Sequence, residues 1–266
     1  MLKQFRVHVG AHLKFYLRNR LVLGLLAASL LMWGMGLLGS WAFESAGGRF
    51  DRLKHLSSQM HGLVWFYGAL LALLAMWSHL RERSTRLVFT RPAAPEVWLA
   101  SIFGAALLVA VAAHAFTAVL TFVLSLAWGV PYQIGFAWRA LDSMLESVVA
   151  IALMAALGVG VHPVIAGFAM FLFSDEFMYY LYVLFASTEV AGGATAWMSI
   201  GKWTTRSVYT VMPMLDPFAD KTAPVASSMR VSAADWGYLA ATAAYAGLIS
   251  TFSFFLGSFT LRRRTL

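Results

Sequence analysis

Three ionisable side chains lie within apolar stretches of this sequence, where charge is otherwise rare. Asp175 and Glu176 occur in FLFSDEFMYYLY, near the middle of one apolar stretch, and His114 is the only ionisable residue of another. An ionisable group at the centre of a bilayer costs about 2.5–3.5 kcal/mol on insertion scales, so it usually faces a cavity or a polar partner. Asp175, Glu176 and His114 are therefore candidates for a substrate path. The alternatives are a hydrogen bond to a neighbouring helix for His114, and a place at the outer rim of a short span for the two acids.

Motifs for metal binding and catalysis are weak. His8 and His12 have the i, i+4 spacing that zinc ligands can use, but no third ligand accompanies them, so no metal site is expected. The sequence has no cysteine and contains neither H-E-x-x-H nor G-x-S-x-G. It also lacks the G-x-x-x-x-G-K-[ST] phosphate-binding loop, so any ATP hydrolysis is expected on another chain.

The composition is that of a polytopic membrane protein. Of the 266 residues, 60% are hydrophobic and only 12% are charged, whereas a soluble domain carries about 25% charged residues. The net charge of +8 fits basic cytoplasmic loops better than a nucleic-acid interface. No stretch has the composition of a separate soluble domain, so residues 1–266 are predicted to form one transmembrane domain.

Six transmembrane α-helices are predicted because the apolar runs are long enough to cross a bilayer as helices. Near the outer end of the fourth, Asp142 and Glu146 face an external vestibule or pair with Arg139. The long segment 187–235 is an external gate or a plain connector. The six predicted spans cover about 21–43, 62–80, 99–128, 141–160, 163–186 and 236–261.

The basic residues predict the orientation. Twelve of the 20 Lys and Arg residues lie in 1–20, 81–96 and 262–266. Basic residues concentrate on the cytoplasmic side of membrane proteins, so both termini are predicted to be cytoplasmic, in a bacterial inner or plasma membrane. The twelve are Lys3, Arg6, Lys14, Arg18, Arg20, Arg81, Arg83, Arg86, Arg91, Arg262, Arg263 and Arg264.

Residues 2–20 have the pattern of an amphipathic helix on the inner membrane surface. Lys3, Lys14 and Arg18 fall opposite an apolar face. The alternative is that these residues are only the basic segment that flanks the first span on the cytoplasmic side. The apolar face consists of Leu2, Phe5, Val9, Leu13 and Tyr16.

The segment RERSTRLVFTRPAAPEVW, residues 81–98, combines four arginines and two acids with an apolar LVF patch. Ser84 and Thr85 could cap a short helix, and Pro92 and Pro95 would end it. A solvated loop has little need for an apolar patch among charges. The segment therefore indicates a short cytoplasmic helix between the second and third spans that docks a soluble partner.

This segment resembles the loop between spans two and three of ATP-binding-cassette permeases of the type-2 (type V exporter-like) class. Glu82, Thr85, Leu87, Val88, Phe89, Arg91 and Pro92 supply most of the pattern, with Ser84 where Gly is usual. The N-terminal helix, the six spans, VMPMLDPF and the ending FFLGSFTLRRRTL are also similar to this class.

The resemblance implies a coupling helix that contacts a separate cytoplasmic ATPase, which carries the ATP and Mg²⁺. It also implies a second permease copy, and no cofactor in this chain. The residues that it assigns to ATPase coupling are Glu82, Arg83, Thr85, Arg86, Leu87, Phe89, Arg91 and Pro92.

The leading hypothesis is thus a transport subunit of an exporter that is not itself an enzyme. The second is an intramembrane enzyme that uses His114, Asp175 and Glu176. The third is a non-transporting membrane subunit, such as a sensor or an immunity protein.

Overall fold

The computed structural model describes residues 2–20, 23–24, 27, 30–31, 34–35, 48–81, 95–172, 183–184, 196–211 and 219–265. The regular elements in these ranges are all helices, which confirms the predicted all-α fold class. They are α1 (Leu2–Arg18), α3 (Arg49–Arg81), α5 (Pro95–Trp128), α6 (Ile134–Gly160), α7 (Pro163–Leu172), α9 (Ala196–Val211), α10 (Ala219–Ser228) and α11 (Ala233–Thr265).

Within the described residues, four helices are long and apolar enough to cross a membrane, and they indicate a membrane protein. They are Arg49–Ser78, Pro95–Trp128, Ile134–Gly160 and Ala233–Arg263. Each of these helices matches one predicted span. The span 62–80 lies in α3, 99–128 in α5, 141–160 in α6 and 236–261 in α11.

Two predicted spans are described only in part. In 21–43, the described residues 23–24, 27, 30–31 and 34–35 are all helical. In 163–186, α7 covers the first ten residues. Six spans therefore stay a prediction.

The spanning helices begin earlier than their apolar runs predict. α3 starts at Arg49, between the predicted spans 21–43 and 62–80, because its charged first turns also carry a buried apolar face. Leu53 and Leu56 on this face are almost fully buried, and Leu53 packs against Phe136 of α6. The spans were predicted from uncharged apolar runs, and a charged amphipathic segment such as the first turns of α3 is not part of such a run. The predicted external segment 187–235 contains α9 and α10. The first of these matches the stretch AWMSIGKWTTRSVYTV, whose apolar spacing predicts a short helix.

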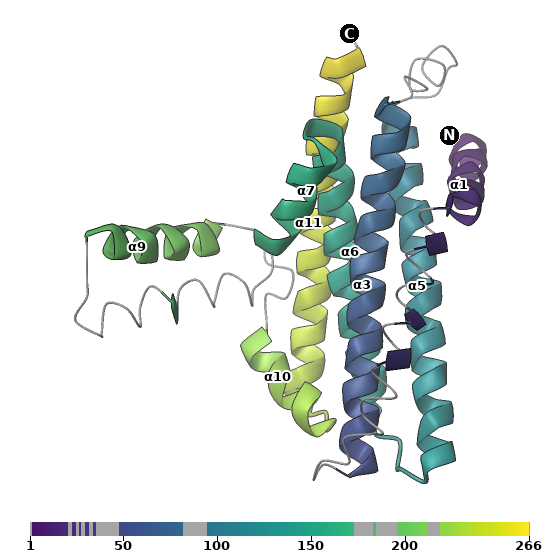
Figure 1. Cartoon of the computed structure of the whole chain (residues 1–266), viewed down its shortest axis with the longest axis vertical. Helices are drawn as coiled ribbons and strands as arrows, with labels where there is room; N and C mark the ends of the chain where they lie inside the picture. The colour runs from purple at the N-terminus through teal and green to yellow at the C-terminus, as the bar shows by residue number, and fades with distance from the viewer. Residues whose placement is uncertain are drawn as a thin grey trace.

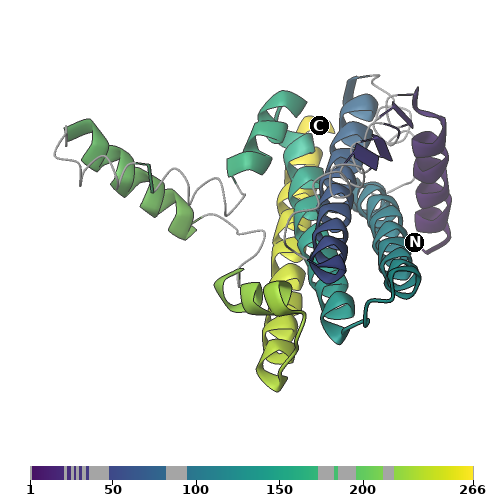
Figure 2. The same ribbon diagram turned by 60° about the horizontal axis from the view of Figure 1, so that its bottom comes forward.

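α6 is the central helix of the bundle. It contacts α3, α5 and α11, and 67% of its most apolar part is buried, against 17% for α11. Figure 1 shows α1, the end of α3, the start of α5 and the C-terminus at one end of the bundle, and α10 at the other. Figure 2 shows α9 standing to the side of these packed helices.

The turn from α5 to α6 has a glycine-dependent helix end. Gly129 adopts a φ of 64°, which a glycine tolerates without strain. The Val130 N–H bonds to the Ser125 carbonyl and the Gly129 N–H to the Leu126 carbonyl. This pair of bonds is a Schellman motif, and it turns the chain so that α6 runs back beside α5.

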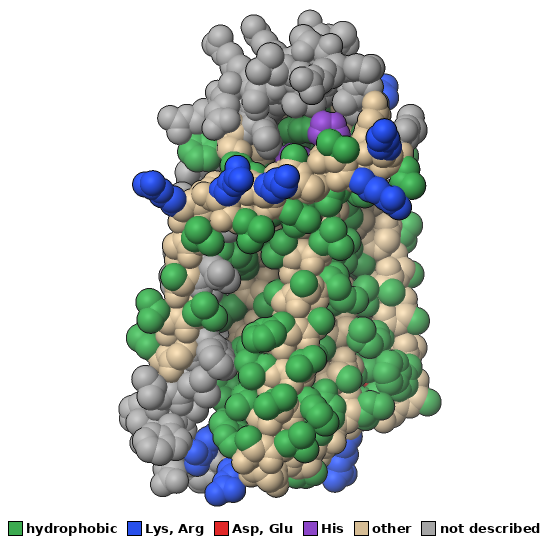
Figure 3. Space-filling view, turned by 90° about the vertical axis from the view of Figure 1, so that its right-hand side faces the viewer, with side chains coloured by type: hydrophobic (Ala, Val, Ile, Leu, Met, Phe, Trp, Pro, Cys, Tyr) green, Lys and Arg blue, Asp and Glu red, His purple; other side chains and the backbone are tan. Residues whose placement is uncertain are grey.

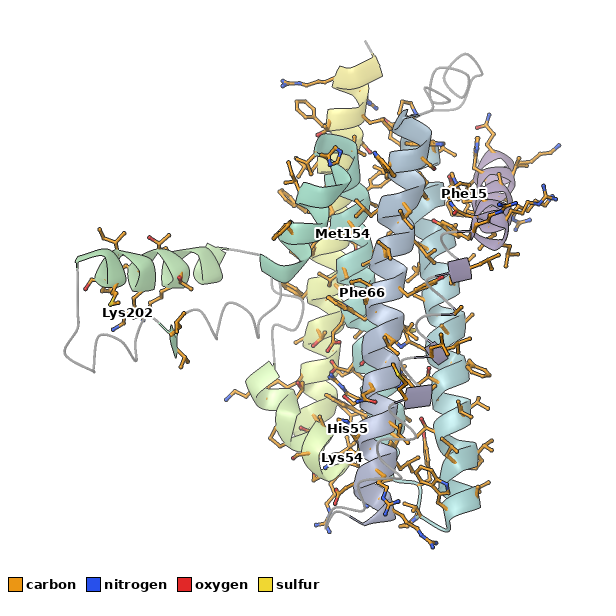
Figure 4. The ribbon with its side chains drawn as sticks, in the orientation of Figure 1. Phe15, Lys54, His55, Phe66, Met154 and Lys202 are labelled. Carbon is orange, nitrogen blue, oxygen red and sulfur yellow. The ribbon has the colours of Figure 1, made fainter. Side chains whose placement is uncertain are left out.

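A second close junction joins α10 to the start of α6. Met229 directly follows α10 and has a φ of 55°, and its N–H bonds to the Val225 carbonyl at 2.7 Å. Its own carbonyl accepts a hydrogen bond from the Gly135 N–H at 3.1 Å. On the α3 side, the Lys54 Nζ donates to the Ser227 carbonyl, and Figure 4 shows Lys54 and the neighbouring His55 beside α10. The junction therefore holds three helices at this end.

Candidate functional site: a buried polar network between three spans

Two histidines from different helices meet inside the bundle. The Nδ1 atoms of His61 in α3 and His114 in α5 are 2.8 Å apart, and their rings stack with centroids 5.1 Å apart. The His114 Nε2 is 2.8 Å from the Ser147 Oγ of α6. All three side chains are at most 2% exposed. A chain of polar groups thus connects α3, α5 and α6.

The direction of these hydrogen bonds follows from the hydrogens available to neutral imidazoles. Ser147 donates its one hydroxyl hydrogen to the Ser143 carbonyl at 2.9 Å, so its oxygen accepts from His114 Nε2–H. The bare Nδ1 of His114 then accepts from His61 Nδ1–H, because a neutral ring carries one N–H. His61 Nε2 is left as an acceptor, and it has no hydrogen-bond partner among the described residues.

Hydroxyl side chains extend this polar zone along α3 and α5. The Thr121 hydroxyl is 3.3 Å from the Ser57 hydroxyl of α3 and donates to the Thr117 carbonyl at 2.8 Å. Ser57, Thr117 and Thr121 are all buried. Inside an apolar bundle, a hydroxyl that bonds to a carbonyl of its own helix has a low free-energy cost of burial. Its oxygen can still accept a hydrogen bond from a neighbouring group.

An ionic triad lies on α6, near the histidines. The Arg139 Nη1 is 2.6 Å from the Asp142 Oδ2 and 3.2 Å from the Glu146 Oε1. The Asp142 side chain is fully buried, and those of Arg139 and Glu146 are 22% and 13% exposed. The pairing with Arg139 is one of the two alternatives that the sequence left open for these acids.

Of the sequence-predicted site residues, only His114 falls within the described ranges. It is buried and hydrogen-bonded to a neighbouring helix, which is the alternative that the sequence analysis gave to a place in a substrate path. A role of His114 in such a path stays a prediction. Asp175 and Glu176 lie outside the described residues. So do the coupling residues Glu82, Arg83, Thr85, Arg86, Leu87, Phe89, Arg91 and Pro92.

His61 and Ser147 are the residues that sequence reasoning missed. His61 directly precedes the predicted span 62–80, so it was placed outside the membrane. Ser147 carries no charge and has no distinguishing motif. A signal did exist for His61, because it is one helical turn from Ser57 and two turns from Leu53 on the buried side of α3.

Metal binding has no support in the described part of the chain, where no three His, Asp or Glu side chains come together. His12 of the earlier His8 and His12 pair packs edge-on to Trp98, with ring centroids 6.5 Å apart. No protein-family model matches this chain, and no curated protein is similar to it.

The His114→Leu variant should be less stable than the wild type by about 1–3 kcal/mol. Leucine removes the acceptor of His61 Nδ1–H and leaves that donor buried without a partner, and this desolvation sets the cost. Thermal unfolding of the purified protein in detergent, followed by fluorescence, measures the change.

The double variant His61→Leu/His114→Leu provides the comparison. It removes both partners, so it should be more stable than His114→Leu alone. The exposed His55 gives a matched control, since His55→Leu should change stability by less than about 0.5 kcal/mol. If His114→Leu and His55→Leu lower stability equally, the network contributes nothing.

Proposed function

We propose that this chain is the transmembrane permease subunit of an ATP-driven exporter. It lies in a bacterial inner or plasma membrane with both termini in the cytoplasm. A separate ATP-binding-cassette ATPase docks on residues 81–96 and hydrolyses ATP. A second copy of the permease, or a related chain, completes the pore-forming part of the complex.

The observation that carries the proposal lies beside the charged connector between α3 and α5. Glu96, in the first turn of α5, accepts a hydrogen bond from the Arg262 Nε at 2.6 Å and a second one from the Arg262 Nη2. Arg262 belongs to the last turns of α11. The downstream end of the connector is thus joined to two spanning helices that are far apart in sequence.

This ion pair is suited to transmitting movement rather than to stabilising the fold. The Arg262 side chain is 66% exposed, and exposed ion pairs contribute only about 0–1 kcal/mol. A displacement of the connector by a partner would move α5 directly and α11 through Glu96. Because α6 packs against both helices, the movement reaches the helix that carries Ser147 and the ionic triad.

The polar network supplies what a transport path needs inside the membrane. Ionisable residues in spans usually face a bundle interior or a path rather than lipid. His61, His114 and the triad of Arg139, Asp142 and Glu146 all do so from α3, α5 and α6. His114 then forms part of the path, with Asp175 and Glu176 as the predicted contributors from the fifth span.

The test is the stoichiometric recovery of an ATPase with the tagged permease. Leu87→Asp and Phe89→Asp should release the ATPase or uncouple its hydrolysis from export, because each places a charge in the apolar patch. Ala94→Asp adds the same charge outside the patch and should leave the complex intact. If all three variants keep the ATPase and export normally, residues 81–96 serve only as a topology signal. If the wild type recovers no ATPase, the permease proposal is wrong.

The ion pair has its own charge-reversal test. Glu96→Arg should leave the ATPase bound but lower the coupling between hydrolysis and export, since two cations then face each other. The double variant Glu96→Arg/Arg262→Glu restores the attraction and should restore coupling. Equal export by both variants would show that the contact transmits nothing.

Single cysteines test the orientation, because the native sequence has none. Ala11 is exposed in α1 and Ser228 is exposed at the end of α10, at opposite ends of the bundle (Figure 1). In whole cells a membrane-impermeant maleimide should label Ser228→Cys and spare Ala11→Cys. The reverse result would invert the topology.

One observation favours a second candidate function, an intramembrane hydrolase. Ser147 Oγ and His114 Nε2 have the 2.8 Å separation of a nucleophile and its base. Against this, Ser147 is fully buried and donates its hydrogen to the Ser143 carbonyl. Ser147→Ala separates the two functions: it should abolish hydrolysis in an enzyme, and leave ATP-coupled export largely intact in a permease.

A further inference from the structure

α1 packs across the outside of α5 rather than joining the bundle. Its buried residues are Val9, His12 and Tyr16, and a side chain at Gly104 of α5 would touch Phe5 and Val9. His12 contacts Trp98, one helical turn from the start of α5. Burial raises the pKa of the Tyr16 phenol above its ordinary value, so this anchor stays neutral.

The contacts on α5 define the depth of α1 relative to a bilayer. Trp98 and Gly104 are roughly 24–30 residues from Trp128, or about 36–45 Å along a helix that rises 1.5 Å per residue. The hydrocarbon core is about 30 Å thick. With the far end of α5 at one interface, α1 lies at the level of the lipid headgroups of the other.

The exposed side of α1 is strongly basic. Figure 3, which faces this side, shows Lys and Arg side chains in a row across the molecule above a broad apolar surface. Residues 1–20 contain no Asp or Glu, and none of these cations forms an ion pair with a residue in the described ranges. The exposed cations are Lys3, Arg6, Lys14, Arg18 and Arg20.

Apolar side chains lie between these cations. Leu2, Val7 and Leu17 are 66%, 64% and 73% exposed. A helix face turned only to water would not need exposed leucines at this depth. Lysine and arginine stems that reach toward phosphates while neighbouring apolar groups enter the acyl region are typical of helices in a membrane interface.

The C-terminal half of α1 also borders a shallow, open groove of about 450 Å³. Its described lining residues all come from this one segment of the chain: Ala11, Lys14, Phe15, Arg18 and Asn19. Lys14 and Arg18 are one helical turn apart on this groove. We propose that the groove binds the headgroup of an anionic phospholipid, with Lys14 and Arg18 on its phosphate. This inference does not depend on the proposed transport function.

The test compares two lipids on the full-length protein in detergent. Retention of dioleoylphosphatidylglycerol and of dioleoylphosphatidylcholine is measured by native mass spectrometry. The wild type should prefer the anionic lipid, and Lys14→Gln/Arg18→Gln should weaken that preference by on the order of tenfold, because each cation near an anionic surface contributes measurably. The matched control is Lys221→Gln/Arg230→Gln. It removes the same charge from exposed residues at the opposite end of the helix bundle, so this variant should keep the preference for the anionic lipid.

Ionic strength gives a second reading on the unaltered protein. At about 1 M salt, where the screening length is about 3 Å, phosphatidylglycerol retention should fall while phosphatidylcholine retention stays constant. Equal retention of the two lipids by the wild type would overturn the proposal. So would equal losses in the two double variants. Recovery of an acidic soluble partner that is lost in Lys14→Gln/Arg18→Gln, with lipid retention unchanged, would assign the surface to that partner instead.

Discussion

The Arg139→Leu variant should lose about 3–5 kcal/mol of stability, one of the largest effects available in this chain. Removing the guanidinium leaves the fully buried Asp142 and the nearly buried Glu146 without their common cation. Breaking a buried ion pair by deleting one partner has this cost because the remaining charge stays desolvated. The loss is measured as a lower midpoint of thermal unfolding in detergent.

Two companion variants distinguish charge pairing from side-chain packing. Arg139→Leu/Asp142→Leu/Glu146→Leu removes the whole triad, and replacing a buried ionic group completely is often neutral or stabilising. It should therefore be more stable than Arg139→Leu, even though it changes more residues. A triple variant that is less stable than the single one would show that the triad acts through packing. Export by the triple variant then reports whether the charges belong to the transport path.

Gly135→Ala should also be severely destabilising, by about 3 kcal/mol. A Cβ at this position would lie 2.3 Å from the Met229 carbonyl oxygen and 2.5 Å from its Cα. Backbone atoms cannot rotate away, so α6 and the end of α10 would have to separate, which is the costly form of overpacking. The separation also removes the hydrogen bond from the Gly135 N–H. Thermal unfolding measures the loss.

Gly62→Ala is the matched control in α3. Nothing lies within 4 Å of a Cβ built at Gly62, and alanine is favoured over glycine within a helix by up to about 1 kcal/mol. Its stability should equal or slightly exceed that of the wild type. If Gly135→Ala behaves like Gly62→Ala, then α10 is not held against α6 in solution.

Sequence patterns predicted the helical class well because hydropathy depends on local composition. Four predicted spans coincide with α3, α5, α6 and α11. The starts of α3 and α6 were less predictable. Leu53 is buried in a cluster with Val130, Phe136 and Met229, which come later in the chain. No local pattern in RFDRLKH contains that information.

The candidate site was predictable where charge interrupts an apolar run, and not elsewhere. His114 is recognisable from its residue type within an apolar run. The pairing of Arg139 with Asp142 and Glu146 was one of the two alternatives that their place in the sequence left open. The contact between His61 and His114 joins residues 53 positions apart. It depends on how α3 and α5 pack, so it becomes visible only in three dimensions.

The spacing of the polar partners has a consequence for biogenesis. Arg139 finds Asp142 three residues later and Glu146 seven residues later on the same helix, so α6 leaves the ribosome with its charges able to pair. Among the residues that the structure describes, the side-chain partner of His61 is the ring 53 residues downstream, which is synthesised later. An unpaired polar ring in the hydrocarbon is costly, which favours holding α3 at the insertion machinery until α5 arrives. The two helices should then enter the lipid as a hairpin, with their histidines already hydrogen-bonded.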